Sequence, residues 1–432
     1  RSGFGLEHYS ENDPQRYYNS IGMDMRFAGM AIAGPTSTFC GVPQKVEFTS
    51  DSDASGDWTN ESNAYDEDDT TAATCALAEL STWEGYLQLN CEAINVDRIL
   101  IKLDRDNARI DDVEVGVYYD DGWHTLSDPT YGSWNNLAIG ATKSVDKIRI
   151  RFHHSGSVGS NTGSVYEVFM IQDSGVGNVV ALADFNDALY CAVENIIGKL
   201  NAGGTEFDYV NHVNADITDL EPFPDGKLYV ACGTSHAYYE MNTSEALTKN
   251  TLSNNQMQFM VTVNTTAPTM YGNDGGNTVR LTTNPADGGS SWSNQTIVGE
   301  SHNVITGLLP HNGALHIMKE DVPYYLDSDG NPKTDLAPEL GTLKSSTSGK
   351  NSVEWLGNLY VQAGTGALME IGSLNTWRNP SDFATNLAES TGAIQALATD
   401  ERYLFAIIDI STKIEVLAGR QERVGSTTTW VW

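Results

Sequence analysis

The chain has 432 residues and a formal net charge of −32, from 57 acidic and 25 basic residues. This charge repels phosphate backbones and anionic lipid headgroups, so nucleic acid and membrane surfaces are excluded as partners. The chain has no run of about 18 apolar residues, so we expect no membrane insertion, and its length favours two or three domains. The acidity is typical of a protein from a salty environment, or of acidic loops that hold Ca²⁺.

Residues 1–40 form an N-terminal segment with one apolar, strand-like run, "MDMRFAGMAIAG". No complementary strand lies near this run in the sequence. We therefore expect residues 26–34 to pair with a strand from another part of the chain.

Residues 44–172 are predicted to form an antiparallel β-sandwich. Short alternating runs are separated by turns every 8 to 15 residues, which is the pattern of such a fold. Cys75 and Cys91 both lie in this region and could form a disulfide within it. The predicted strands are "KVEFTS", "YLQLNC", "RILIKL", "VEVGVYY", "KIRIRFHH" and "SVYEVFMIQ".

Five runs of this region resemble, in order over about 125 residues, the discoidin or factor 5/8 C-terminal family of galactose-binding-like jelly rolls. That family shows Asp-Gly-Asn-x-x-Thr-x-Trp early, Asp-Gly-x-Trp in a middle strand, then an Arg-Ile-Arg strand and a closing strand with Glu. The resemblance implies a jelly-roll sandwich. The runs are "NAYDEDDTTAA", "VDRILIKL", "VEVGVYYDDGWHTL", "VDKIRIRF" and "VYEVFMI".

The resemblance also implies a structural Ca²⁺ site between an early loop and the last strand, because hard oxygen ligands suit this ion. Two positions depart from the family pattern, since Glu67 replaces the glycine and Ala73 replaces the tryptophan. The alternative is an acidic surface loop without a metal. The implied ligands are Asp66, Asp68, Thr71 and Glu167.

Members of this family that bind sugar use aromatic, His and Arg side chains on the loops at one end of the sandwich. For each candidate, the alternative is a packed or solvated side chain. We expect Trp123, in "DDGWH", to be a core residue and His124 to be exposed. The implied ligand-binding residues are Trp58, Trp83, His153 and His154.

Residues 176–432 repeat a unit of about 43 residues with several short alternating strands. A Leu or Met directly before an aromatic residue or a His marks each unit and recurs at intervals of 39 to 45 residues. This period predicts a β-propeller of six blades, and the abundance of Thr, Val and Tyr argues against helical repeats. The fold class is therefore all-β, with the sandwich inserted near the N-terminal end of the propeller. The markers are Leu189, Leu228, Met270, Leu315, Leu359 and Leu404.

Propellers commonly close when a strand from one terminus completes a blade at the other. The last unit ends at "TTTWVW", so we predict that residues 26–34 join this blade.

Two motifs in the repeats resemble functional sites. "NPADGGSSW", residues 284–292, has the spacing of the Asp box of sialidase-like propellers, but the arginine cluster that a sialidase needs is missing. We expect a structural turn in which Asp287 accepts backbone N–H bonds and Trp292 packs beneath. "LDSDGNPKTD" has the first ligands of a calcium loop but Pro338 in the twelfth place, so a hairpin turn is favoured.

The sequence shows no Ser-His-Asp order, Walker loop or His-Glu-x-x-His motif. We therefore expect a non-enzymatic structural or adhesion protein, extracellular or on a virion surface, that resembles phage tail proteins in style. Its expected partners are glycans or cell-surface polysaccharide, and other copies or other virion proteins. The alternative is a secreted propeller glycosidase or lyase with an accessory carbohydrate-binding domain, and a third possibility is a eukaryotic cell-surface protein with glycosylated sequons.

Overall fold

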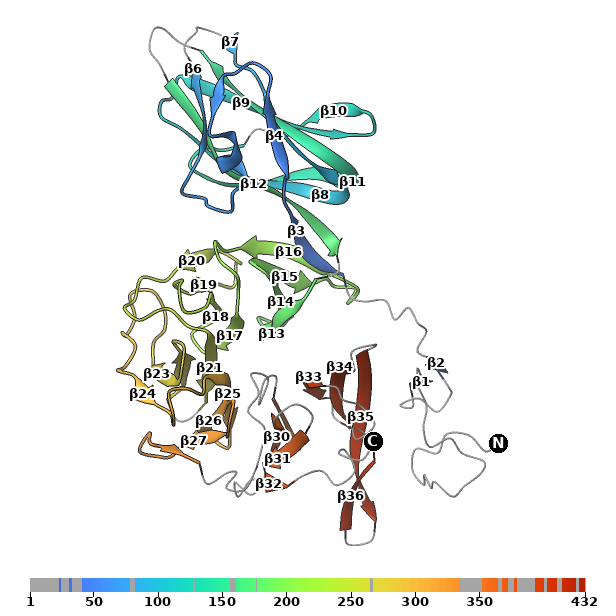
Figure 1. Cartoon of the computed structure of the whole chain (residues 1–432), viewed down its shortest axis with the longest axis vertical. Helices are drawn as coiled ribbons and strands as arrows, with labels where there is room; N and C mark the ends of the chain where they lie inside the picture. Colours follow the sequence, from blue (N-terminus) through green and yellow to red (C-terminus); the bar gives the residue numbers. More distant parts are fainter. Residues whose placement is uncertain are drawn as a thin grey trace. The chain divides into compact units, whose positions relative to one another are not determined.

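The computed structural model contains strands almost throughout, with one short 3₁₀ helix (η1, Glu61–Ala64) among the described residues (Figure 1). The chain divides into two compact units, which correspond to the sandwich and to the repeats. In the described part of the chain, no helix is long and apolar enough to span a bilayer. The structure describes residues 23–24, 31–32 and 41–431, except 78–81, 127–128, 156–160, 176, 265–266, 335–351, 364–366, 372–376, 379–392, 400–401, 410–413 and 425–426.

Two long strands, β8 (Leu87–Arg105) and β11 (Ser133–His154), run through the whole sandwich and pair with each other. On its other side β11 pairs with β9 (Ile110–Tyr119), and β8 pairs with β12 (Asn161–Gly175). Register shifts in the β8–β11 pairing, at residues 138–143 and 145–147 of β11, mark bulges where the sheet bends. The remaining strands are β3 (Val42–Val46), β4 (Ser50–Asp53), β5 (Trp58–Thr59), β6 (Ala73–Leu77), β7 (Thr82–Trp83) and β10 (Gly122–Thr125).

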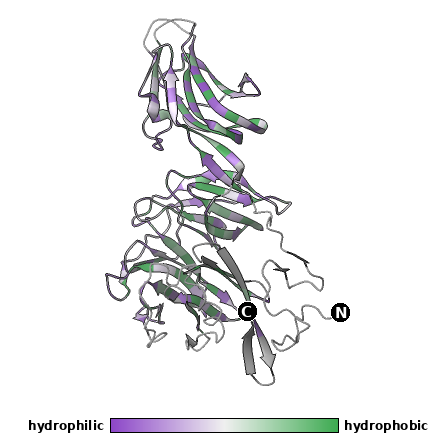
Figure 2. Ribbon diagram, turned by 45° about the vertical axis from the view of Figure 1, so that its right-hand side comes forward, coloured by the Kyte–Doolittle hydropathy of each residue, from purple (hydrophilic) through white to green (hydrophobic). Residues whose placement is uncertain are grey.

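The sandwich core follows from strand alternation. In β11, Ile148, Ile150 and Phe152 are fully buried, while the residues between them point outward. Figure 2 shows the same alternation as hydrophobic and hydrophilic bands along these strands. Cys75 and Cys91 are free thiols and do not form the disulfide that the sequence allowed; burial raises the pKa of Cys75 to about 12.

The second unit consists of six four-stranded antiparallel sheets in chain order, which confirms the six-bladed propeller. The first three sheets are β13 (Val179–Phe185), β14 (Ala188–Val193), β15 (Ile196–Leu200) and β16 (Phe207–His212); β17 (Asp219–Phe223), β18 (Lys227–Ala231), β19 (Tyr239–Met241) and β20 (Leu247–Lys249); and β21 (Phe259–Val263), β22 (Thr269–Asn273), β23 (Thr278–Thr282) and β24 (Thr296–Ile297). The last three are β25 (Ile305–His311), β26 (Ala314–Lys319), β27 (Tyr324–Leu326) and β28 (Pro332–Lys333); β29 (Val353–Trp355), β30 (Asn358–Ala363), β31 (Ala367–Ile371) and β32 (Trp377–Arg378); and β33 (Ala393–Thr399), β34 (Leu404–Asp409), β35 (Ile414–Val424) and β36 (Thr427–Val431).

All six repeat markers lie at the start of the second strand of their sheet, as the period predicted. Five of them are at most 2% exposed, because buried apolar clusters join successive sheets. The exception is Leu189, which is 36% exposed. Its neighbour Tyr190 packs toward the second sheet, so Leu189 lies on the opposite face, together with the exposed side chain of Leu182.

The predicted strand over residues 26–34 lies largely outside the described residues. Ala31–Ile32 (β2) pairs with Met23–Asp24 (β1). The sixth sheet draws all four of its described strands from the C-terminal residues. The joining of residues 26–34 to the propeller stays a prediction.

The Asp-box-like loop connects the third and fourth strands of the third sheet. Trp292 is buried, and its Nε1 donates to the Tyr238 hydroxyl at 3.3 Å. The Asp287 carboxylate accepts the N–H of Thr251, in the loop after β20, at 2.9 Å, and also the Thr251 hydroxyl. Asp287 therefore accepts backbone N–H bonds, as expected, from Gly288 in its own turn and from Thr251, and the second bond links two sheets.

The segment "LDSDGNPKTD", which has the first ligands of a calcium-binding loop, contains the hairpin turn between β27 and β28, as predicted. The Asp327 carboxylate accepts the backbone N–H groups of Asp329 and Asn331 at 3.0 and 2.8 Å. These bonds are those of a tight turn with an Asp side chain at its start.

Candidate functional site

Four polar side chains of β11 lie in a line on the outer face of the sandwich, because they alternate with the buried Ile148, Ile150 and Phe152. The adjacent strands complement them in register. On β9, Glu114 lies opposite Arg151. The four outward residues of β11 are Lys147, Arg149, Arg151 and His153.

Aromatic rings lie between and beside the two arginines. The Arg149 guanidinium carbon is 4.2 Å from the ring centre of Tyr86 and 4.4 Å from that of Trp123. The Arg151 guanidinium carbon is 4.3 Å from the Tyr86 ring and 4.6 Å from the Trp83 ring. Each such contact contributes about 0.5–2 kcal/mol. We call these five residues the Arg–aromatic row.

Glu114 contacts three residues of the Arg–aromatic row: Arg151, Tyr86 and Arg149. Its Oε2 accepts two hydrogen bonds from Arg151, at 2.9 and 2.5 Å, and its Oε1 accepts the Tyr86 hydroxyl at 3.1 Å and lies 3.5 Å from Arg149. Burial would raise the pKa of Glu114, but these hydrogen bonds and the charges of both arginines outweigh it and lower the pKa. One carboxylate thus faces two guanidinium groups.

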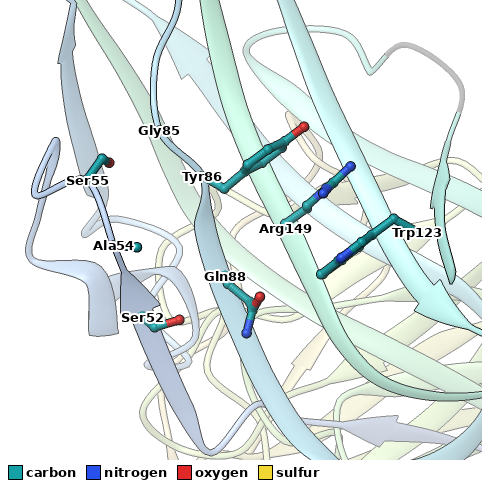
Figure 3. Close-up of a pocket in the computed structure, with 8 residues that line it drawn as sticks. All are labelled: Ser52, Ala54, Ser55, Gly85, Tyr86, Gln88, Trp123 and Arg149. Atoms are coloured by element: carbon teal, nitrogen blue, oxygen red, sulfur yellow. The ribbon is translucent and has the colours of Figure 1, made fainter. Parts of the chain in front are cut away.

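A hollow of about 420 Å³ lies beside Arg149, within the usual size range of small-molecule sites. Figure 3 shows the Arg149 side chain between Tyr86 and Trp123, with Gln88 next to it and the β4 side of the hollow opposite. The walls therefore combine aromatic rings with amide, hydroxyl and guanidinium groups. The lining residues are Ser52, Ala54, Ser55, Gly85, Tyr86, Gln88, Trp123 and Arg149.

Close packing at Gly85 shapes one wall. A Cβ atom at this position would lie 2.4 Å from the Ser55 Cβ atom, so only glycine lets the two loops approach. Asp57 accepts the Gly85 N–H at 2.8 Å, and Trp58 Nε1 donates to the Gly85 carbonyl at 2.9 Å. Trp58 thereby helps to hold the backbone that carries Tyr86.

The structure separates the four sequence-predicted ligand residues into two pairs. Trp58 and His154 are 3% and 0% exposed, and both belong to the interior of the sandwich. Trp83, at 37% exposure, contacts the His153 ring with 5.1 Å between ring centres. His153 Nδ1 lies 2.7 Å from the Asp111 carboxylate. Trp83 thus belongs to the Arg–aromatic row and His153 lies next to it, whereas Trp58 and His154 face away from solvent.

The predicted calcium ligands do not form a metal site in this structure. The two Asp66 carboxylate oxygens accept the Asp68 N–H and the Thr71 hydroxyl, at 3.1 and 2.9 Å. Glu167 is a buried residue of β12. In the described residues, no group of three His, Cys, Asp or Glu side chains is placed to hold a metal ion. Ca²⁺ binding at these residues stays a prediction of the sequence.

Sequence reasoning missed Tyr86, Arg149, Arg151 and Trp123 as site residues. Trp123 was expected in the core, but it is half-buried on the outer face, because β10 pairs with the edge of β9. The adjacent His124 is also half-buried and stacks on Tyr119, with 3.8 Å between ring centres. A usable signal was present in "KIRIRF", where cations alternate with apolar residues in an otherwise acidic chain.

The propeller also contains a pair of acidic side chains on one strand. Asp219 and Glu221 on β17 accept the backbone N–H groups of Met260 and Thr262 on β21, at 2.8 and 2.7 Å. Burial raises the pKa of Asp219 to about 6 and that of Glu221 to about 8. These bonds give both carboxyl groups a structural role between the second and third sheets.

The sequence matches no protein-family model and no curated protein. Several solved structures are similar to this chain at low sequence identity. A catalytically inactive virginiamycin B lyase from Staphylococcus aureus with quinupristin is 10% identical, with 74% of this chain and 99% of that chain covered and a TM-score of 0.45. The extracellular domain of a one-component system from B. thetaiotaomicron is 12% identical, with 78% and 39% covered and a TM-score of 0.42.

A family 32 carbohydrate-binding module from C. perfringens, in complex with galactose, is 17% identical, with 30% of this chain and 100% of that chain covered and a TM-score of 0.23. The chain's own strand pairing, six four-stranded sheets and a separate ten-stranded sheet, shows that it combines a propeller with a sandwich. These structures give no support to the expected resemblance to phage tail or virion proteins.

The expectation that the chain is not an enzyme needs correction. It rested on missing sequence motifs, and the similar propellers include virginiamycin B lyases, which are enzymes. The missing motifs therefore do not exclude catalysis by a propeller. At 10% identity and a TM-score of 0.45, this likeness assigns no reaction to the chain.

Proposed function

We propose that the sandwich is a carbohydrate-binding domain, that its ligand binds in the hollow beside Arg149, and that the protein recognises glycans outside the cell. The observation that carries this proposal is the placement of Tyr86 and Trp123 on either side of Arg149 at the wall of a 420 Å³ hollow. The resemblance of the sequence to galactose-binding-like domains supports the same class of ligand.

The lining has the chemistry that a sugar requires. The rings supply apolar surface for C–H groups, and a few polar groups orient the hydroxyls. Gln88 donates one N–H to Asn90 at 2.7 Å and keeps its second N–H and its carbonyl oxygen for a ligand. Ser52 offers a hydroxyl, and the Ser55 hydroxyl, which donates to Asp53 at 2.7 Å, can still accept a hydrogen bond. Trp83 and His153, farther along the Arg–aromatic row, are placed to contact a second sugar unit of a longer chain.

The test is binding of the purified full chain to a glycan array, followed by titration of the best ligand. We expect Trp123→Ala and Gln88→Ala to weaken binding about ten-fold or more, because each removes a wall or a hydrogen-bonding group of the hollow. Trp83→Ala should weaken only the binding of longer oligosaccharides.

The matched control is Trp134→Ala. Trp134 packs against Phe169, 5.4 Å between ring centres, in the part of the sandwich where β11 pairs with residues 99–103 of β8. Its loss should leave glycan affinity unchanged. Absence of binding to any glycan, or equal binding by Trp123→Ala and the wild type, would contradict the proposal.

A further inference from the structure

The charges around the hollow point to a more specific ligand, and this step rests on the function proposed above. We infer that the bound sugar carries an oxyanion, a carboxylate or a sulfate group, and that Arg149 binds this group. The charges on β11 and β9, the contacts of Arg149 and the net charge of the whole chain carry the inference.

The Arg–aromatic row has more positive than negative charge. In the part of the chain that the structure describes, Glu114 is the one carboxylate bonded to either arginine, and it bonds mainly to Arg151. Its contact with Arg149 is 3.5 Å, too long for a strong charge-assisted bond. Glu114 therefore neutralises the positive charge of Arg149 only weakly, and this charge can attract an anionic group of a ligand.

Stacking holds Arg149 in one orientation, and the one hydrogen bond that its Nη2 donates, to Glu114 Oε1, is 3.5 Å long. Its guanidinium lies between two rings at 4.2 and 4.4 Å, and its Nε is buried without a hydrogen-bond partner among the described residues. A planar guanidinium fixed by stacking presents its remaining N–H groups as a fork, which matches the geometry of a carboxylate or a sulfate. Because the side chain is already ordered, binding costs little conformational entropy.

Lys147 supplies a second positive charge on the same line. It lies 4.2 Å from the Tyr118 ring centre, opposite Tyr118 in the β9–β11 register, and its nearest carboxylate oxygen, on Asp146, is 3.9 Å away. Successive acidic groups of a polysaccharide could therefore contact Arg149 and Lys147 in turn.

The net charge of −32 makes the inference testable, because the molecule as a whole repels polyanions. Nonspecific attraction cannot draw an anionic glycan to this protein. Any binding must come from a local site strong enough to overcome that repulsion. Added salt should therefore weaken binding less than it does for a basic protein, since it screens the overall repulsion together with the Arg149 contact.

The experiment uses the full chain and an array of glycans in matched pairs that differ only in one acidic group: galactose and galacturonate oligomers, and galactose oligomers with and without sulfate. We expect at least one acidic member to bind about ten-fold or more tightly than its neutral counterpart. Arg149→Gln should abolish this preference, and Arg149→Lys should keep part of it, because lysine retains the charge without the fork. The carboxylate and sulfate arms identify which group the site prefers.

Lys143→Gln is the control, because Lys143 is another cation of β11 and pairs with Asp120 outside the hollow. It should leave the preference intact. Equal binding of neutral and acidic members, unaffected by Arg149→Gln, would overturn the inference but leave the proposed function standing. Failure to bind any glycan would remove both. If Arg149→Gln does not fold, Arg149→Lys carries the test.

Discussion

Gly116 on β9 and Arg149 on β11 lie directly opposite each other, and a Cβ atom at Gly116 would be 3.0 Å from the Arg149 Nε and 3.1 Å from its Cγ. The same Cβ atom would be 3.5 Å from the Trp123 ring. The absence of a side chain at this position therefore gives Arg149 room to lie flat between its two rings.

We expect Gly116→Ala to displace the Arg149 side chain and to weaken glycan binding, with little change in stability. The steric cost is offset in part by the preference of a strand for Ala over Gly, about 0.5–1 kcal/mol. Binding titration and thermal unfolding measure the two effects. Gly122→Ala is the control, because its Cβ atom would meet His124 at an ordinary 3.7 Å. Unchanged affinity in Gly116→Ala would show that the position of Arg149 does not matter.

Replacing the marker leucine by alanine should destabilise the protein more in the second blade than in the first. Leu228→Ala should lower the free energy of unfolding by about 2–5 kcal/mol, because Leu228 is fully buried between the first and second sheets. Leu189→Ala, at the same place in the first sheet but 36% exposed, should cost about 1 kcal/mol or less. Denaturant unfolding of both variants checks this difference. Similar losses would mean that the face of Leu189 is covered in solution.

Asp287 joins the third sheet to the second through Thr251. Hydrogen bonds from the hydroxyl and the N–H of Thr251 lower the pKa of Asp287. Its contribution to stability is therefore present at neutral pH and is lost as the pH falls below its ordinary value of 3.8. Asp287→Ala should lower the unfolding temperature at pH 7 but not at strongly acidic pH, whereas Asp329→Ala, at an exposed turn position, should have no effect at either pH. A pH-independent loss would point to packing instead.

At Glu221 we expect the opposite pH dependence: its contribution to the stability of the fold decreases as the pH rises. Its pKa rises from 4.5 to about 8, first because of burial and also because of the nearby Asp219 charge. The folded state therefore holds the proton more tightly, so this contribution is complete below pH 4.5 and is lost as the pH rises toward 8. Glu221→Gln keeps an acceptor for the Thr262 N–H and should reduce that loss. Unfolding measured from pH 4 to 9 tests this, and parallel curves for variant and wild type would refute it.

Calcium binding can be measured separately from sugar binding. Ca²⁺ at the predicted ligands would tie the early loop to β12, so Ca²⁺ should raise the unfolding temperature and EDTA should reverse the rise. Mg²⁺ serves as the control for ionic strength. Asp66→Asn and Asp68→Asn should both remove this stabilisation, and an unfolding temperature that neither Ca²⁺ nor EDTA changes would contradict the site that the sequence implied.

Local patterns alone determined the architecture. The alternation of Ile148, Ile150 and Phe152 with polar residues specifies a half-buried strand, because side chains of a strand point to opposite faces. The repeat of about 43 residues placed every marker on the second strand of a blade, because each blade folds largely from contiguous sequence. These signals need no knowledge of distant partners.

Only the tertiary structure decided the site. Tyr86, Trp123 and Arg149 come from separate segments. They meet because β10 pairs with β9, β9 pairs with β11, and β11 pairs with β8, the strand that directly follows Tyr86. Trp58, on β5 beside β6, is buried, whereas Trp123, on β10 beside β9, is half-buried on the outer face, the reverse of what their sequence contexts indicated. Asp287 likewise bonds to Thr251 on another sheet. Such contacts depend on which strands pair and at what register, and a single sequence carries no local signal for either.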